Sequence, residues 1–279
     1  ANWALVTGSQ GALVDVLMLL DQPLPDGVDE EAPAPMNFEK LLEFSDVRFR
    51  YANSGPWVLD GLTLDIPRGS RIGFVGSTGS GKSTAMDLLM ALLDPTEGEI
   101  LVDHRPITGD GQRAWQRTIA HVPQTIYLAD ASIAENIAFG VSSSAIDHDR
   151  VREAAEQAQI AEFVEGRPGG YASMVGERGV RLSGGQRQRI GIARALYKRA
   201  SVLIFDEATS ALDNATEAAV LSAIENLDRE LTILIIAHRL TTLQDCDKIV
   251  LLDSGRIVAQ GTYDEMDSKH LTPDRVSKT

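Results

Sequence analysis

The chain has 279 residues, in which 26 Lys and Arg stand against 40 Asp and Glu, and its formal net charge is −14. Hydrophobic residues make up 43%, and the 24 glycines and 11 prolines are ordinary numbers, which excludes collagen-like and low-complexity chains. The acidic balance disfavours non-specific binding of nucleic acid, because the field of such a chain repels phosphates.

Residues 1–39 form an acidic leader that contains no Lys or Arg. Apolar residues at helical spacing within 13–20 predict a helix with one apolar face, and prolines between 23 and 35 predict a linker. The apolar stretch is too short for a membrane span and lacks the basic flank of a signal peptide. Two interpretations remain open: a solvated tail, or a helix that packs on or continues from a segment preceding Ala1.

From Leu41 on, predicted strands alternate with predicted helices. The apolar runs at 202–205 and 232–237 are continuous, as expected for strands that are covered on both faces. Further strands are predicted at 42–49, 62–66, 71–75, 99–102, 119–122, 249–252 and 256–260, and helices at 82–93, 149–165 and 186–197. This order predicts an α/β fold with a mainly parallel sheet and a hairpin at 253–255.

The motif at 76–84 matches G-x-x-x-x-G-K-[ST] and lies between a predicted strand and a predicted helix. Glycines let successive N–H groups turn toward phosphate oxygens, and the helix start adds its positive end. Lys82 then reaches the β- and γ-phosphates, and the Ser83 hydroxyl is placed to bind Mg²⁺. The motif consists of Gly76, Ser77, Thr78, Gly79, Ser80, Gly81, Lys82, Ser83 and Thr84.

The end of the apolar strand 202–205 predicts a second part of the same site. Asp206 follows this strand, where a carboxylate can hold the water shell of Mg²⁺. The adjacent Glu207 is placed to polarise a water near the γ-phosphate. Such a strand end is weak evidence alone, but together with the glycine loop it indicates nucleotide hydrolysis.

Residues 182–186 predict a second anion site at a helix start. Ser183 with Gln186 three residues later has the form of a capping box, and the paired glycines leave other N–H groups for an anion. A single nucleotide does not need two such helix starts in one chain. The residues of this motif are Leu182, Ser183, Gly184, Gly185 and Gln186.

Over about residues 40–265 the sequence resembles the ATP-binding cassette (ABC) family, whose signature motif is matched by 182–186 without departure. Tyr51 is similar to the family's adenine-stacking aromatic, and Gln124 to its glutamine that senses Mg²⁺ and the attacking water. His238 is similar to its histidine that contacts the γ-phosphate. Residues 210–213, ending in Asp213, resemble its loop that crosses between protomers.

The resemblance implies a RecA-like P-loop NTPase core with a mainly parallel sheet, an antiparallel β subdomain, and a helical subdomain at about 127–197 that carries the signature. It implies a head-to-tail dimer in which each ATP, with Mg²⁺, lies between 76–84 of one copy and 182–186 of the other. Ser83, Gln124 and Asp206 would hold Mg²⁺. Gln124, Glu207 and His238 would act in hydrolysis. The expected organisation is a leader (1–39), an ATPase domain (40–265) and a tail (266–279).

Within the family, residues 130–140 and 175–179 resemble the exporter type, and the leader is similar to the stretch that joins a last membrane helix to the ATPase domain. This implies a transmembrane domain fused on the N-terminal side and a location at the cytoplasmic face of the membrane. The lack of Lys and Arg in 1–39 argues against it, because cations gather just inside a membrane. Residues 124–130 resemble members that move lipid-linked sugars or polysaccharide precursors.

Two other classes of function remain open. A soluble ABC ATPase acting on ribosomes or DNA would normally need a second cassette, a coiled-coil insertion or a basic face, and the sequence suggests none of these. A P-loop small-molecule kinase would not require residues 182–186 or His238.

Overall fold

The computed structural model describes residues 11, 13–22, 33–206, 214–237 and 240–267. The chain divides into two units, Ala1–Pro33 and Ala34–Thr279. In the first unit residues 13–20 are helical, as predicted, and their side chains are exposed. None of the helices in the described ranges combines the length and the apolar character needed to cross a membrane.

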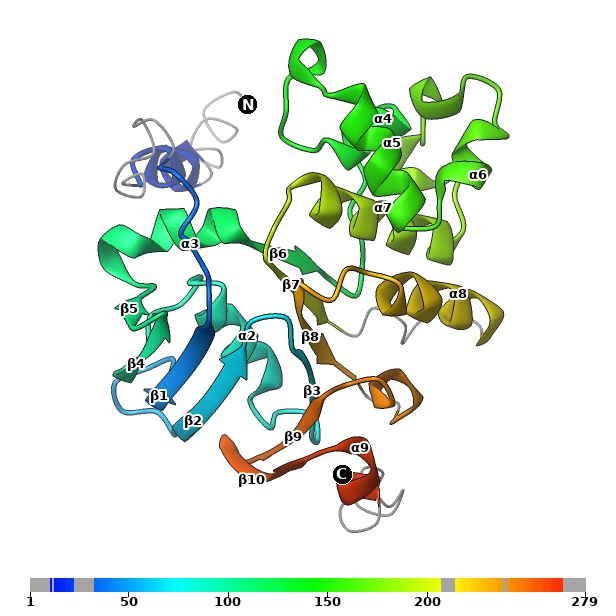
Figure 1. The fold of residues 1–279 in the computed structure, drawn as a ribbon. Coiled ribbons are helices and arrows are strands. Elements are labelled where there is room, and N and C mark those ends of the chain that lie inside the picture. The colour runs from blue at the N-terminus through cyan, green and yellow to red at the C-terminus, as the bar shows by residue number, and fades with distance from the viewer. Residues whose placement is uncertain (1–10, 12, 23–32, 207–213, 238–239, 268–279) are drawn as a thin grey trace. The chain divides into compact units, whose positions relative to one another are not determined.

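The larger sheet of the second unit has six strands in the order β10-β9-β3-β8-β7-β6 (Figure 1). Every neighbouring pair is parallel except the β9–β10 hairpin, so the predicted mainly parallel sheet is confirmed. β3 and β8 are buried along their whole length, which explains their continuous apolar runs. The strands are β3 (Arg71–Val75), β6 (Ile119–Val122), β7 (Val202–Asp206), β8 (Thr232–Ile236), β9 (Lys248–Asp253) and β10 (Arg256–Gly261).

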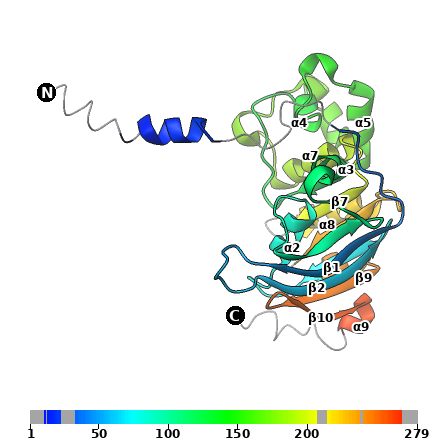
Figure 2. The same ribbon diagram turned by 90° about the vertical axis from the view of Figure 1, so that its left-hand side faces the viewer.

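In the described residues, the smaller sheet has four strands in the order β2-β1-β4-β5 (Figure 1), and β1 and β2 lie side by side in Figure 2. All of its pairs are antiparallel, as the resemblance implied for the β subdomain. The strands are β1 (Leu41–Phe49), β2 (Leu59–Pro67), β4 (Glu97–Val102) and β5 (Arg105–Pro106).

A group of helices lies between β6 and β7 in the chain and on the same side of the larger sheet (Figure 1). This group contains α4 (Ile133–Ile137), α5 (His148–Gln157), α6 (Ala161–Glu165) and α7 (Gly184–Tyr197). The other helices are α2 (Lys82–Leu89), α3 (Gln112–Thr118), α8 (Asn214–Glu225) and α9 (Tyr263–Asp267).

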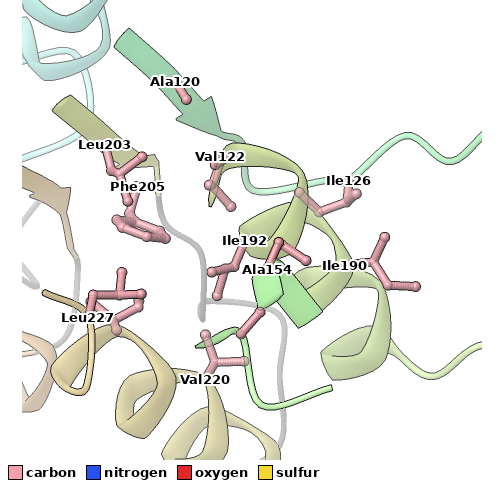
Figure 3. Packing of buried hydrophobic residues seen from close by; sticks show 14 of the residues in the cluster. Ala120, Val122, Ile126, Ala154, Ile190, Ile192, Leu203, Phe205, Val220 and Leu227 are labelled. Atoms are coloured by element: carbon pink, nitrogen blue, oxygen red, sulfur yellow. The ribbon is translucent and has the colours of Figure 1, made fainter. Parts of the chain in front are cut away.

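The two faces of the larger sheet bury different apolar clusters. Leu203 and Phe205 of β7 point into a cluster shared with α5, α7 and α8 (Figure 3). The alternate residues, Val202 and Ile204, point into a cluster shared with α2, α3 and the smaller sheet. Helices α2 and α7 therefore pack on opposite faces of one sheet.

Two predicted helices are shorter in the structure. The helix predicted at 82–93 ends as α2 at Leu89, because Ala91 adopts a left-handed φ of 51°. The helix predicted at 149–165 is divided into α5 and α6, because Gln159 has a φ of 53°. Helices α3, α4, α8 and α9 are not among the predicted elements.

Candidate functional site

The glycine loop runs from the end of β3 to the start of α2 and is braced by neighbouring backbone. Gly76 has a φ of 151°, and a Cβ at this position would lie 2.2 Å from the carbonyl oxygen of Leu252. The N–H of Gly255, in the β9–β10 turn, donates to the carbonyl of Ser80 at 3.1 Å. Gly81 has a φ of 103°, which glycine adopts readily. Close backbone packing therefore requires glycine at position 76, and the positive φ favours glycine at position 81.

The start of α2 receives no cap from any side chain in the described part of the chain. Its first residue, Lys82, is only 5% exposed, and the Lys82 Nζ donates to the carbonyls of Gly76 (2.8 Å) and Ser77 (3.0 Å). Ser83 is exposed on the first turn. Helix N–H groups, the positive helix end and a buried ammonium together form a strong site for phosphates.

Tyr51 lies beside this loop. Its hydroxyl is 3.3 Å from Oγ1 of Thr84, and its ring meets Phe49 edge to face with centroids 4.9 Å apart. The Tyr51 side chain is nevertheless 68% exposed, so most of its ring is available to a ligand. A ring held in this way offers a flat surface for stacking by a base next to the phosphate loop.

The carboxyl ends of the parallel strands form the edge of the sheet where the glycine loop begins. Asp206 ends β7 and is half-buried, and Gln124 follows β6 by two residues and is exposed. Because β3, β8, β7 and β6 are consecutive parallel neighbours, both side chains belong to the edge from which the loop leaves β3. Their oxygens, with the Ser83 hydroxyl, are the hard donors that Mg²⁺ prefers. Glu207, residues 210–213 including Asp213, and His238 lie outside the described residues.

His121 of β6 also lies near this edge, although the sequence patterns did not single it out. The His121 side chain reaches the surface, but partial desolvation by the surrounding protein lowers the pKa of its imidazole, while the carboxylates of Asp206 and Asp87 favour the charged form. Burial likewise raises the pKa of Asp87, on α2. The lowered pKa disfavours the charged form of the imidazole beside Asp206. The available signal in the sequence is the position of His121, a polar residue within the otherwise apolar predicted strand 119–122.

The signature segment begins α7, and its predicted capping box is confirmed. The Ser183 hydroxyl accepts from the Gln186 N–H at 3.3 Å, and the Ser183 N–H donates to Gln186 Oε1 at 2.9 Å. Ser183 is exposed, while Leu182 anchors the segment by being buried. Within this chain α7 belongs to the helical group and α2 lies against the two sheets (Figure 1), so the two predicted anion sites are built in separate parts of the fold.

Side chains of α7 bind the segment around Gln124 through further contacts that the sequence patterns did not predict. Gln188 Nε2 donates to the Pro123 carbonyl (3.3 Å), and Arg194 Nη2 donates to the Tyr127 carbonyl (3.0 Å). A Cβ at Gly191 would lie 2.5 Å from Cδ1 of Ile126, so a glycine within the helix permits this close approach. An isolated glycine inside a helical pattern was the available signal.

Comparison with known proteins gives the same family in each case. The family described as ABC transporter matches residues 59–210. The ATP-dependent lipid A-core flippase of Chromohalobacter salexigens is 43% identical over 248 residues, which are 89% of this chain and 42% of that protein. The beta-(1→2)glucan export ATP-binding/permease protein NdvA of Rhizobium etli is 44% identical over 248 residues, 87% of this chain and 42% of that protein.

A solved structure is also similar. A bacterial Atm1-family ABC exporter with ATP bound matches with a TM-score of 0.79 and 37% identity, covering 95% of this chain and 47% of that one. The chain thus spans less than half the length of these relatives.

Proposed function

The chain belongs to the ABC transporter family, and from this premise we propose that it is the ATP-hydrolysing nucleotide-binding domain of an exporter. The observation that carries the proposal is the uncapped start of α2 with the buried Lys82 folded into its loop. ATP places its phosphates against this helix start and its adenine against Tyr51. The domain itself corresponds to residues 40–265, with 1–39 as leader, about 127–197 as the helical subdomain, and 266–279 as tail.

The residues at the carboxyl edge of the sheet suit a Mg²⁺-bound nucleotide. Mg²⁺ supplies neutralisation of the charge that develops between the β- and γ-phosphates. Ser83, Asp206 and Gln124 would hold it, because their hydroxyl, carboxylate and amide oxygens are the appropriate donors. Glu207 orients and polarises the attacking water, Gln124 senses that water, and His238 contacts the γ-phosphate.

Glu207→Gln tests the hydrolytic role directly. The amide keeps the size of the side chain but cannot polarise water, so ATP hydrolysis is expected to fall by at least about a hundredfold. Binding of MgATP, measured at equilibrium with a fluorescent analogue, should persist. Glu153→Gln, on the exposed surface of α5, is the matched control. Hydrolysis by Glu207→Gln at the parent rate would refute the assigned role.

A second copy of the chain completes each site. The ATP held by residues 76–84 of one copy also contacts residues 182–186 of the other, and Asp213 lies between the copies. Ser183→Arg, made in the Glu207→Gln background, is expected to leave nucleotide binding to the monomer intact and to prevent the ATP-dependent dimer seen by size-exclusion chromatography. Ser183→Ala removes the cap without added bulk and should weaken the dimer less than Ser183→Arg does. A dimer peak unaltered by Ser183→Arg would argue against the shared site.

The other partner is a transmembrane domain, fused N-terminally, which holds this domain at the cytoplasmic face of the membrane. An apolar groove of about 670 Å³ supports this assignment, because Leu92, Phe139 and Val141 line it and are exposed. Phe139→Ser should leave ATP hydrolysis by this chain unchanged and reduce ATP-dependent transport by the full-length protein. Transport by Phe139→Ser at the parent level would show that the groove does not contact the transmembrane domain.

The proposed cargo is a lipid-linked sugar or a polysaccharide precursor. The support is that the relatives include proteins named as a lipid A-core flippase and a glucan exporter. The full-length protein reconstituted in vesicles should flip a fluorescent lipid-linked oligosaccharide when MgATP is supplied. The Lys82→Ala variant is the control, and equal flipping by parent and variant would exclude this cargo.

A further inference from the structure

Helix α3 covers the C-terminal end of α2, the helix that begins at the phosphate loop. The last carbonyls of a helix have no partner within it and need donors from elsewhere. Side chains of α3 supply these donors, so the end of α2 is capped by another helix. The hydrogen bonds run from Trp115 Nε1 to the Leu89 carbonyl (2.6 Å), from Gln112 Nε2 to the Ala91 carbonyl (2.6 Å) and from Gln116 Nε2 to the Ala91 carbonyl (3.0 Å).

The same helix holds the chain where it enters the second unit. The Met36 N–H donates to the Ala114 carbonyl at 3.0 Å, and the Thr118 hydroxyl donates to the Met36 carbonyl at 2.8 Å. Phe38, which is buried, meets the ring of Trp115 edge to face with centroids 6.4 Å apart. Both backbone polar groups of Met36 are therefore bound to α3.

The entering segment is fixed again a few residues later. Asp103, in the β4–β5 turn, accepts from the N–H groups of Glu39 (2.7 Å), Lys40 (2.9 Å) and Leu41 (2.9 Å). Burial acts to raise the pKa of Asp103, but these three donors outweigh it and hold the pKa below the usual value. The segment from Met36 to Leu41 is thus held by α3 at Met36 and by the β4–β5 turn at 39–41.

The C-terminal end of α3 is held by the signature helix. Lys198, which follows α7, donates through Nζ to the carbonyls of Gln116 and Ile119, each at 2.6 Å. Burial, with a smaller effect of Arg117, lowers the pKa of Lys198. One seven-residue helix thereby contacts the entering segment, the end of α2 and the end of α7.

We infer that α3 is a coupling element, in which Trp115 is the positioning residue that links the entering segment 36–41 to the phosphate loop. Trp115 is fully buried and contacts Phe38 through its ring and the Leu89 carbonyl through its N–H. Helix α2 has eight residues, so it is a stiff rod about 12 Å long with Lys82 at its other end. A displacement of Phe38 is then transmitted to Lys82, since packed interiors pass on strain rather than absorbing it. The consequence for ATP rests on the proposed function.

Hydrogen exchange of the nucleotide-free chain tests the coupling without relying on ATP. Phe38→Leu is expected to raise the exchange of the Met90 and Ala91 amides, at the end of α2, by about tenfold. Phe44→Leu, at an equally buried site within β1, is the matched control and should change these amides by less than twofold. A change after Phe38→Leu no larger than after Phe44→Leu would overturn the inference.

A double-mutant cycle identifies Trp115 as the link. Trp115→Phe keeps an aromatic ring but removes the donor to the Leu89 carbonyl, so these amides should already exchange faster. Adding Phe38→Leu to Trp115→Phe should then raise exchange by less than twofold, whereas equal factors in both backgrounds would exclude Trp115 as the link. If Trp115→Phe does not fold, Thr118→Val in the parent background is used instead of Phe38→Leu, because it removes the hydrogen bond from α3 to the Met36 carbonyl. Unchanged hydrogen exchange at the Met90 amide would then count against the inference.

Nucleotide affinity provides the functional readout. Phe38→Leu should weaken MgATP binding by about fivefold, while Phe44→Leu should leave it within twofold of the parent. Unchanged affinity after Phe38→Leu, with raised exchange in α2, would show that the displacement does not reach the phosphate loop. A parent chain that binds no ATP would instead refute the proposed function and leave the exchange result valid.

Discussion

Helix α2 begins without a side-chain cap in the described residues, whereas α7 begins with a complete capping box. At α2 the N-cap is Gly81, in the left-handed region, and the ammonium of the buried Lys82 folds back onto the loop. At α7 the Ser183 hydroxyl and the Gln186 side chain satisfy each other's backbone N–H groups. Both helix starts are anion sites in the proposed function, but only one of them is satisfied by its own sequence.

The difference indicates an order of binding. An uncapped helix start beside a buried ammonium gains most from an arriving phosphate, because the phosphate completes hydrogen bonds that no side chain of the described ranges makes. A capped start has fewer N–H groups left without a partner and therefore less to gain from an arriving phosphate. We therefore expect ATP to bind first at α2, and the α7 of a second copy to join the loaded site afterwards.

Lys82→Ala gives the largest expected effect and tests the α2 side of this comparison. Removing a charged donor from the γ-phosphate is expected to reduce ATP hydrolysis by about 10²–10³-fold, measured as phosphate release under saturating MgATP. Lys40→Ala removes the same side chain from an exposed position and should hydrolyse ATP at the parent rate. Residual hydrolysis within tenfold of the parent would mean that Lys82 is not the main cation of the site.

The glycines of the loop provide the next largest effect. At Gly76 a methyl group would lie 2.2 Å from a backbone oxygen, whereas at Gly79 nothing lies within 4 Å, although both have positive φ. Gly76→Ala should lower stability by about 3 kcal/mol or more and weaken MgATP binding at least tenfold. Gly79→Ala should lower stability only by the backbone strain of about 1–2 kcal/mol. Urea midpoints and ATP titrations check this, and equal losses would show that close approach is not what selects Gly76.

Local rules explain which parts of the molecule were predictable. The glycine loop, the buried strands and the Ser183–Gln186 box follow from spacing over a few residues, and the structure contains each of them. The capping box of α4 gives the same signal in the sequence, because Ser132 precedes Glu135 by three residues. The start of α4 was therefore predictable from the sequence. The five residues of α4 are too few to show a helical period.

Other features depend on tertiary contacts that no local pattern shows. Helix α3 exists where Trp115 and two glutamines meet the end of α2, far away in sequence. The end of α2 at Leu89 is set by the left-handed Ala91, a residue type that favours helix continuation. The roles of Glu207, Asp213 and His238 stay predictions, because these residues lie outside the described part of the chain.

Ser183→Ala tests the start of α7 in this comparison, and its expected effect on stability is smaller than that of Gly76→Ala. Loss of an N-cap is expected to lower stability by about 1 kcal/mol, measured by urea unfolding. Ser132→Ala removes the corresponding cap of α4 and should cost a similar amount. Only Ser183→Ala should also weaken the ATP-dependent dimer of the Glu207→Gln background. Equal weakening by Ser132→Ala would show that the effect on the dimer comes from general destabilisation.

The smallest expected effect is a pH dependence that separates the two capping boxes. In α4 the reciprocal residue is Glu135, whose pKa is held below its usual value by hydrogen bonds from the Ser132 hydroxyl, the Ser132 N–H and the Ser143 hydroxyl. A lowered folded-state pKa means that this carboxylate stabilises the fold above the unfolded value of about 4.3 and that the contribution is lost as the pH falls through the folded value. The melting temperature of the parent should therefore exceed that of Glu135→Gln at pH 7, with the difference shrinking below about pH 4.

The capping box of α7 has Gln186 in this place, which does not titrate, so Gln186→Glu should give α7 the same acid sensitivity. A Gln186→Glu variant whose melting temperature follows the parent at every pH would show that the cap at the signature is not built as the one at α4 is.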